Sequence, residues 1–359
     1  MIDLEIFLYP IAFLAAITIV VFFHELGHYW VARRSGVEVE VFSIGFGPEI
    51  FAWQAKNGTR WRVAALPLGG YVRMRGDENA ASLASEGAVH MPGSFSGAPL
   101  LSRIAIISAG PLANFILGII LFALVYTVVG KAFIPPHIGK VMPETAAAEA
   151  GLQEGDKVLS VNGRSVRDFA ELRSLVFESP EKELLFEINR FSEIKLIAVT
   201  PRPIYVERLK MTAGQLGVRS APGLFRKLGL YEAAVTASAD TVHLTSMMLR
   251  GLGRLFSGSG SQSEIGGPVR IAEFAGDAAR QGLASFLIFT AVISINLGLI
   301  NLMPVPVLDG GHLLMFIFEG IRGKPLPEQL QGVLMRGGMA LLLSLMIVVT
   351  FFDLFRVVS

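Results

Sequence analysis

The sequence has no cysteine among its 359 residues and few charged side chains. Without cysteine, a disulfide scaffold, a thiolate zinc site and an iron–sulfur site are excluded. Charged residues make up 17% of the chain, well below the roughly 25% that is usual for a soluble domain. The 31 basic residues nearly balance the 30 acidic ones, so the formal net charge is +1. This balance argues against nucleic acid as the main partner.

Hydrophobic residues make up 52% of the chain instead, and they are concentrated in long runs. A run of about 20 apolar residues is long enough to cross the hydrocarbon core as a helix. Four uncharged runs have this character, namely residues 6–23, 104–129, 286–303 and the shorter 337–352. The sequence therefore predicts a polytopic α-helical membrane protein with about four transmembrane helices in contact with the lipid bilayer.

The loops between these runs predict the orientation of the chain. Lys and Arg side chains collect between the first two runs and between the last two. Short loops rich in Lys and Arg stay in the cytoplasm. The termini and the segment from about residue 131 to 283 are then expected in the periplasm of a Gram-negative cell. We expect a multi-pass protein of the bacterial inner membrane.

The long segment between the second and third runs is predicted to form a small folded module followed by a linker. Residues 158–161, 183–189 and 194–200 have strand-like patterns, whereas residues 168–177 have helical spacing after a suitable N-cap, Asp168. Residues 240–256 place apolar side chains on one helical face. This amphipathic helix is expected either on the membrane surface or packed against the module.

The motif His24-Glu25-Leu26-Gly27-His28 follows directly on the first apolar run. On a helix, His24 and His28 share a face, so both imidazoles can reach one divalent ion. Glu25 can lie beside a metal-bound water as general base. Ionisable groups are costly in a membrane span and are usually functional there. The motif predicts a catalytic zinc site.

A catalytic zinc site needs a third protein ligand, and Asp309 is the best candidate. It lies in residues 301–311, where two prolines break the helix and two glycines permit a sharp turn. A buried carboxylate there would need a cation. His312 is the competing ligand, and Glu319 is expected on a helix surface.

Four sequence motifs together resemble those of a known family. They are His24-Glu25-Leu26-Gly27-His28, Gly69-Gly70-Tyr71-Val72, Gly110-Pro111-Leu112-Ala113-Asn114, and residues 296–311. In this order they resemble the site-2 protease family of intramembrane zinc metalloproteases, most closely its bacterial branch that regulates the sigma-E response. The resemblance implies His24, His28 and Asp309 as ligands of Zn²⁺. Glu25 is the implied catalytic base.

The expected substrate-binding residues lie around this site. Asn301 matches a family asparagine that engages substrate. Residues 39–51 and 59–71 read as a hairpin that could offer an edge to an unwound substrate. We expect substrate contacts from Asn301, Asn114, Gly69 and Gly70. The alternatives are a plain cytoplasmic hairpin and asparagines that join neighbouring helices.

The module outside the membrane resembles a PDZ domain of the bacterial protease-associated type. The matching segments are residues 138–141, 146–156 and 161–163. A PDZ groove would bind a peptide or chain terminus by strand addition. The family branch carries two such domains in tandem, whereas the room between residues 131 and 240 fits one.

These expectations divide the chain into four parts. Residues 1–130 form an N-terminal membrane part with the metal motif, a membrane-associated β-hairpin region and the second span. Residues 131–203 form one α+β PDZ domain, inserted between the second and third spans. Residues 204–283 form a periplasmic linker with the amphipathic helix, and residues 284–359 form the C-terminal membrane part with the third ligand.

The predicted function is zinc-dependent hydrolysis of peptide bonds in transmembrane segments, with the active site towards the cytoplasmic side. The resemblance implies membrane-embedded single-span substrates that another protease has already trimmed, such as anti-sigma factors, and signal peptides in addition. The competing interpretation is a non-catalytic membrane adaptor that holds a structural metal and presents a PDZ groove. Against it, structural zinc sites have four protein ligands, and the sequence offers three good ones.

Overall fold

The computed structural model describes residues 4–76, 92–206, 211–257, 267–324 and 326–358, and they form two compact units. The helical unit contains the chain up to Thr127 and from Gly229 onward. The inserted unit runs from Val128 to Leu228. The inserted unit therefore interrupts the helical unit in sequence.

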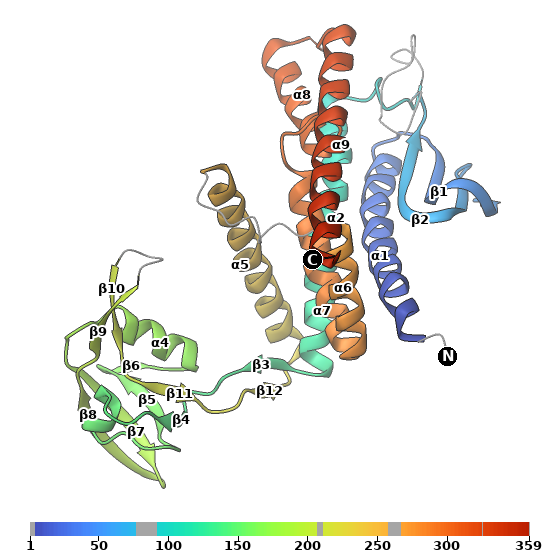
Figure 1. The fold of residues 1–359 in the computed structure, drawn as a ribbon. Helices are drawn as coiled ribbons and strands as arrows, with labels where there is room; N and C mark the ends of the chain where they lie inside the picture. Colours follow the sequence, from blue (N-terminus) through green and yellow to red (C-terminus); the bar gives the residue numbers. More distant parts are fainter. Residues whose placement is uncertain (1–3, 77–91, 207–210, 258–266, 325, 359) are drawn as a thin grey trace. The chain divides into compact units, whose positions relative to one another are not determined.

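Long helices dominate the helical unit (Figure 1). They are α1 (Leu4–Arg34), α2 (Leu100–Val128), α5 (Leu230–Phe256), α6 (Pro268–Arg280), α7 (Leu283–Asn301), α8 (Asp309–Arg322) and α9 (Glu328–Val358). Among the described residues, four helical stretches are long and apolar enough to cross a membrane. They are Phe7–Arg34, Leu100–Val128, Leu283–Asn301 and Gln329–Phe351. Each overlaps one of the four predicted runs.

Two of these helices, α1 and α9, extend by nine or more residues past one end of the apolar runs that predicted them. Helix α1 continues past His24 to Arg34, so the metal motif lies inside the helix and not at its end. Helix α9 begins at Glu328, before the predicted start at residue 337. Charged residues ended the apolar runs in the sequence, but they do not end a helix whose backbone hydrogen bonds continue.

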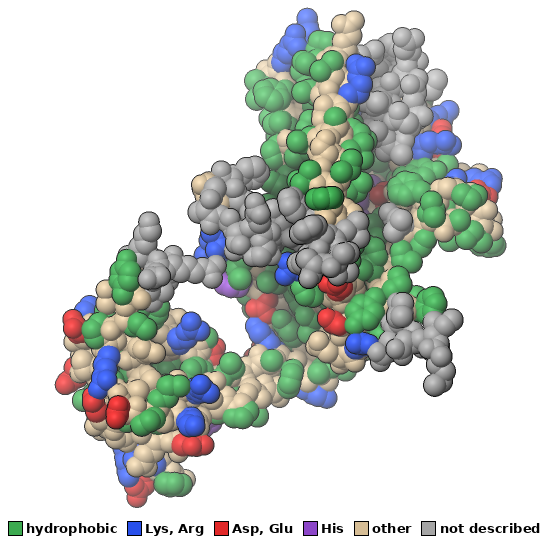
Figure 2. Space-filling view, viewed as in Figure 1, with side chains coloured by type: hydrophobic (Ala, Val, Ile, Leu, Met, Phe, Trp, Pro, Cys, Tyr) green, Lys and Arg blue, Asp and Glu red, His purple; other side chains and the backbone are tan. Residues whose placement is uncertain are grey.

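Apolar side chains cover the outer faces of these helices. Ile116, Ile120 and Leu124 follow one another along α2 at helical spacing, and each is about half exposed. Figure 2 shows hydrophobic side chains along the visible side of α9, where Leu341 and Ile347 are exposed. Exposed apolar surface of this kind is what a lipid-facing helix requires.

Glycines bring α1, α2 and α7 into close contact. A Cβ on Gly27 of α1 would lie 2.3 Å from the carbonyl oxygen of Ala109 on α2. A Cβ on Gly118 of α2 would lie 2.6 Å from a side-chain carbon of Ile295 on α7. Small residues at helix crossings let backbones pack directly in membrane proteins. The metal motif of α1 therefore lies tightly against α2.

Strands β1 (Val39–Gln54) and β2 (Arg60–Met74) form the predicted hairpin beside α1 (Figure 1). The turn at Asn57-Gly58 places Gly58 at a positive φ of 89°, which a glycine adopts easily. Shifts in the pairing register curl the two strands. Phe42 stacks on Trp61 with ring centroids 4.1 Å apart. The hairpin thus shares one hydrophobic core with α1 and α2 next to the metal motif.

The inserted unit is a small α+β fold around a four-stranded antiparallel sheet of order β6-β5-β7-β8. Val158, Phe186 and Ile188 form part of its core and are fully buried. Asp168 caps α4 as predicted, because its side chain accepts the Glu171 N–H. The elements are β3 (Lys131–Phe133), β4 (Ile138–Val141), α3 (Ala146–Glu149), β5 (Lys157–Val161), β6 (Arg164–Ser165), α4 (Phe169–Phe177), β7 (Leu184–Arg190), β8 (Glu193–Val199), β9 (Arg202–Val206), β10 (Met211–Gln215), β11 (Val218–Ser220) and β12 (Leu224–Arg226).

The inserted unit extends past the expected boundary at residue 203 and ends at Leu228. Strand β11 pairs with β4, and β12 pairs with β3. Residues that were expected to start a linker therefore return to the first strands of the unit. Strands of three residues are too short to show an alternating pattern in the sequence.

The predicted amphipathic helix over residues 240–256 is the C-terminal part of α5, which begins at Leu230. The Tyr126 hydroxyl of α2 donates a hydrogen bond of 2.7 Å to the Asp240 carboxylate of α5. Helix α5 is therefore tied to a helix of its own unit.

Candidate metal centre

A cavity of about 230 Å³ opens in the helical unit, lined by α1, β2 and the start of α8. Helix α1 contributes the metal motif, and β2 contributes the segment after Gly69. Phe46 of β1, Ile107 of α2, Asn301 of α7 and the loop between α7 and α8 complete the lining. The lining includes His24, Glu25, His28, Gly70, Tyr71, Val72, Asn301, Val307, Asp309 and His312.

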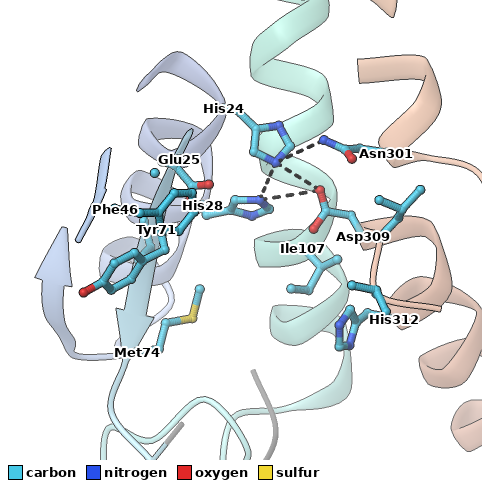
Figure 3. Close-up of a pocket in the computed structure, with 14 residues that line it drawn as sticks. His24, Glu25, His28, Phe46, Tyr71, Met74, Ile107, Asn301, Asp309 and His312 are labelled. Carbon is cyan, nitrogen blue, oxygen red and sulfur yellow. Dashed lines mark hydrogen bonds and ion pairs between the residues drawn. The ribbon is translucent and has the colours of Figure 1, made fainter. Parts of the chain in front are cut away.

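Three metal-binding side chains meet in this cavity, namely His24, His28 and Asp309 (Figure 3). Nε2 of His24 lies 3.2 Å from Nε2 of His28 and 3.2 Å from Oδ2 of Asp309. Nε2 of His28 lies 3.6 Å from the same oxygen. Tetrahedral zinc with ligand bonds of about 2.0–2.1 Å places its ligand atoms roughly 3.3 Å apart. The three atoms therefore have the spacing that one zinc ion requires.

The environment of Asp309 also fits a cation. Its Oδ2 atom is buried, and no donor among the described residues makes a hydrogen bond to it. A buried carboxylate oxygen that faces two imidazole nitrogens is costly unless a positive charge compensates it. With three protein ligands, a fourth position is left for water or substrate, which is typical of catalytic zinc sites and not of structural ones.

Glycines also hold Asp309 in place at the start of α8. A Cβ on Gly310 would lie 2.2 Å from the Met303 carbonyl oxygen, and one on Gly311 would lie 2.4 Å from that of Val305. Helix α8 can therefore begin directly against the α7–α8 loop. The two glycines that the sequence suggested for a sharp turn are needed for this close approach.

Contacts behind the histidines fix their rings. Nδ1 of His28 lies 2.8 Å from the Ile106 carbonyl oxygen. Because a carbonyl only accepts, Nδ1 carries the proton and Nε2 keeps a free lone pair. Nδ1 of His24 lies 3.2 Å from Nδ2 of Asn114, whose side chain is fully buried. Both rings therefore have a partner on α2.

Glu25 and Asn301 flank the three-residue cluster. Glu25 lies on the β2 side of the histidine pair (Figure 3), and its Cγ would be 3.4 Å from a Cβ on Gly70. Nδ2 of Asn301, at the end of α7, lies 3.5 Å from Nε2 of His24. A carboxylate and an amide thus border the metal centre within the cavity.

Of the four residues expected to contact substrate, two line the cavity and two do not. Asn301 and Gly70 line the cavity. Gly69 has a φ of 153° and faces the Phe46 ring, 2.4 Å from where its Cβ would be. Asn114 lies behind His24. His312, the competing ligand, lines the cavity but lies apart from the cluster (Figure 3).

The sequence did not indicate a buried ion pair that supports α8. Arg103, near the start of α2, donates to both carboxylate oxygens of Glu319 at 3.1 and 2.5 Å. Glu319 lies on α8 outside the three-ligand cluster, and this pair leaves its side chain only 17% exposed. The two residues are 216 positions apart, so no local pattern could reveal the pair.

Comparison with known proteins agrees with this geometry. The chain matches peptidase family M50 over residues 12–345. A Rhizobium meliloti (strain 1021) protein that carries a zinc metalloprotease name is 40% identical over 355 residues, covering 95% of each chain. Metalloprotease MmpA of Caulobacter vibrioides is 36% identical over 380 residues, covering 96% of this chain and 95% of MmpA. Enterococcus faecalis eep, named as a protease, is 32% identical over 422 residues, covering 96% of this chain and 98% of eep.

The family match spans the metal motif, the inserted unit and Asp309, and it confirms the resemblance to the site-2 protease family. The M50 family depends on zinc, which agrees with the spacing of the three ligand atoms. The protein therefore belongs to peptidase family M50, the site-2 protease family, and is a multi-pass membrane zinc metalloprotease.

Proposed function

We propose that the protein cleaves the transmembrane segments of single-span proteins after another protease has trimmed them, as in regulated intramembrane proteolysis. The observation that carries this proposal is the place of the metal centre. His24 and His28 lie within α1, a helix long and apolar enough to cross a membrane. A peptide bond that reaches them has to enter the bilayer. Anti-sigma factors and signal peptides are the expected kinds of substrate.

In this proposal His24, His28 and Asp309 would hold Zn²⁺, which would supply a Lewis acid for the scissile carbonyl and the attacking water. Glu25 accepts a proton from the attacking water and passes it to the leaving amine. Its place on the β2 side of the histidines supports this role. The Asn301 amide donates a hydrogen bond to the substrate backbone beside the metal centre.

The substrate has to be extended before cleavage, because helical hydrogen bonds shield its carbonyl groups. Gly70, Tyr71 and Val72 of β2 line the cavity next to Glu25. Residues 70–74 of β2 pair with residues 39–44 of β1 along one edge, whereas residues 60–63 have β1 on both edges. We propose that the substrate adds to β2 as a further strand, with main-chain hydrogen bonds giving affinity for many sequences.

The inserted unit is proposed to be a PDZ domain that binds a peptide or chain terminus. A cavity of about 310 Å³ lies beside α4, β10 and β11. Its apolar lining includes Phe169, Leu172, Val176 and Leu216. A helix next to a strand is the arrangement in which PDZ domains hold an extended peptide. We also propose the inner membrane as the location, with the inserted unit and both termini in the periplasm.

The experiment that tests the proposed function is cleavage of a tagged single-span model substrate by purified protein in detergent. Wild type, Glu25→Gln, and wild type treated with a zinc chelator are compared on full-length and pre-trimmed substrate. We expect only untreated wild type to cut, with the cut inside the apolar segment. Glu25→Gln keeps the size of the side chain and all three ligands, so its zinc content should equal that of wild type.

The adaptor interpretation predicts a different result from the same experiment. A folded, zinc-loaded wild type that leaves both substrates intact would favour the adaptor. Cutting by Glu25→Gln at the wild-type rate would remove Glu25 from the chemistry.

Asn114 is proposed to orient His24, in place of the substrate contact expected for it. When His24 binds zinc through Nε2, its Nδ1 carries a proton and needs an acceptor. Rotation of the Asn114 amide by 180° supplies Oδ1 at the place of Nδ2, 3.2 Å from Nδ1. The buried amide reaches the ring from behind, where no substrate has to enter.

Asn114→Leu is therefore expected to weaken zinc binding about 10- to 100-fold, whereas Asn114→Asp, which can only accept, should bind zinc nearly as well as wild type. Competition with a chromophoric chelator measures both affinities. Ser294→Ala is the control, since it removes only a hydroxyl that donates to the Asn114 backbone oxygen. If Asn114→Asp and Asn114→Leu weaken zinc binding equally, the proposed role of Asn114 in orienting His24 is contradicted.

A further inference from the structure

The loop between α7 and α8 contains a β-turn with an unusual residue in it. The Leu308 N–H donates to the Val305 carbonyl oxygen at 3.1 Å, which closes the turn Val305-Pro306-Val307-Leu308. Val307 has a φ of 85°. Proline in the second position and a positive φ in the third define a type II turn. The third position of such a turn normally holds glycine or asparagine.

Valine is a costly residue for this place. A β-branched side chain clashes with its own backbone at positive φ, so such residues are outliers there. Val307 is the only β-branched residue with positive φ in the described part of the chain. The turn itself does not require the valine side chain, since glycine would form it without strain. Strained residues of this kind are concentrated at functional sites.

The place of Val307 shows what its side chain can contact. Val307 lies two residues before Asp309 and lines the same cavity as Glu25 and Gly70. The surrounding backbone has little freedom, because Gly310 and Gly311 pack directly on the carbonyl groups of the loop. The loop therefore holds Val307 at the wall of the cavity, near the metal centre.

We propose that Val307 contacts the substrate and limits the size of the side chain next to the cleaved bond. This inference rests on the proposed function, because it places an extended substrate in the cavity. Removing the isopropyl group enlarges the cavity beside Asp309. The kcat/KM for substrates with a bulky residue at that position then rises relative to that for substrates with a small residue.

The test uses full-length protein in detergent and two single-span substrates with Ala or Phe beside the mapped cut. Val307→Gly and Val307→Ala are compared with wild type, and Val305→Ala is the matched control in the same turn. We expect Val307→Gly to keep its zinc content and to unfold at the wild-type temperature or above. Both variants at position 307 should shift the Phe-to-Ala ratio of kcat/KM by about tenfold or more towards Phe. The control should leave this ratio unchanged.

Three results would overturn the inference, each in a different way. A lower unfolding temperature in Val307→Gly with an unchanged substrate ratio would show that the valine only fills space. Failure of wild type to cut either substrate would remove the proposed function, and the substrate contact of Val307 with it. Normal cutting by wild type with unchanged ratios in both variants removes the inference about Val307 alone.

Discussion

Gly110→Ala is expected to weaken zinc binding so far that the purified protein holds less than one ion per chain, while the protein still folds. A Cβ at this position would lie 2.2 Å from Nε2 of His28 and 2.8 Å from Cε1 of His24. The atoms in the way belong to the two ligand rings, which can turn aside without moving a helix. The single methyl group therefore displaces the ligands and leaves the backbone in place.

The measurement for Gly110→Ala is zinc content after purification, followed by cleavage of the model substrate. We expect substoichiometric zinc and a loss of cleavage of about 100-fold or more, since displacements near 1 Å have such effects in active sites. Gly337→Ala on α9 is the matched control, because a Cβ there meets no atom within 4 Å. Full zinc content in Gly110→Ala would show that both rings can bind the metal from another place.

Arg103→Met and Glu319→Leu are each expected to destabilise the helical unit by about 3–5 kcal/mol, because either change leaves a buried charge without its partner. The two side chains are only 14% and 17% exposed. Arg103 also lies over the Phe316 ring of α8, 5.0 Å from its centroid. The pair thus joins the start of α2 to the helix that begins with Asp309.

The double variant Arg103→Met/Glu319→Leu should recover most of the lost stability, because a buried ion pair replaced by apolar residues is often neutral. Unfolding in mixed micelles at rising denaturing-detergent content measures the free energies. The exposed pair Arg73–Glu40, with side chains 43% and 46% exposed, is the control. Arg73→Met should cost less than about 1 kcal/mol. A double variant as unstable as the sum of the single ones would contradict this account.

The parts of the site that could be predicted depend on short spacing or on one residue's chemistry. His24 and His28 share a helical face at four residues' distance, and α1 presents both to one cavity. Asp309 was predicted because a carboxylate at membrane depth needs a cation, and its oxygen lies beside both rings. Four apolar runs likewise predicted four long helices.

The features that could not be predicted depend on contacts between distant segments or on backbone angles. The Arg103–Glu319 pair joins two helices that no sequence pattern relates. The role of Gly110 depends on how closely α1 approaches α2. Valine at position 307 gives no sign of a positive φ, because its type favours extended backbone. The end of the inserted unit depends on two three-residue strands.

The pairing of β3 with β12 has a consequence for how this protein can change in evolution. Lys131 lies opposite Arg226, so the chain enters and leaves the inserted unit side by side. Neighbouring strands are about 4.8 Å apart, which a turn of a few residues can bridge. A gene could therefore lose, exchange or duplicate this unit through one short junction, while the helices that carry the zinc ligands stay connected as before.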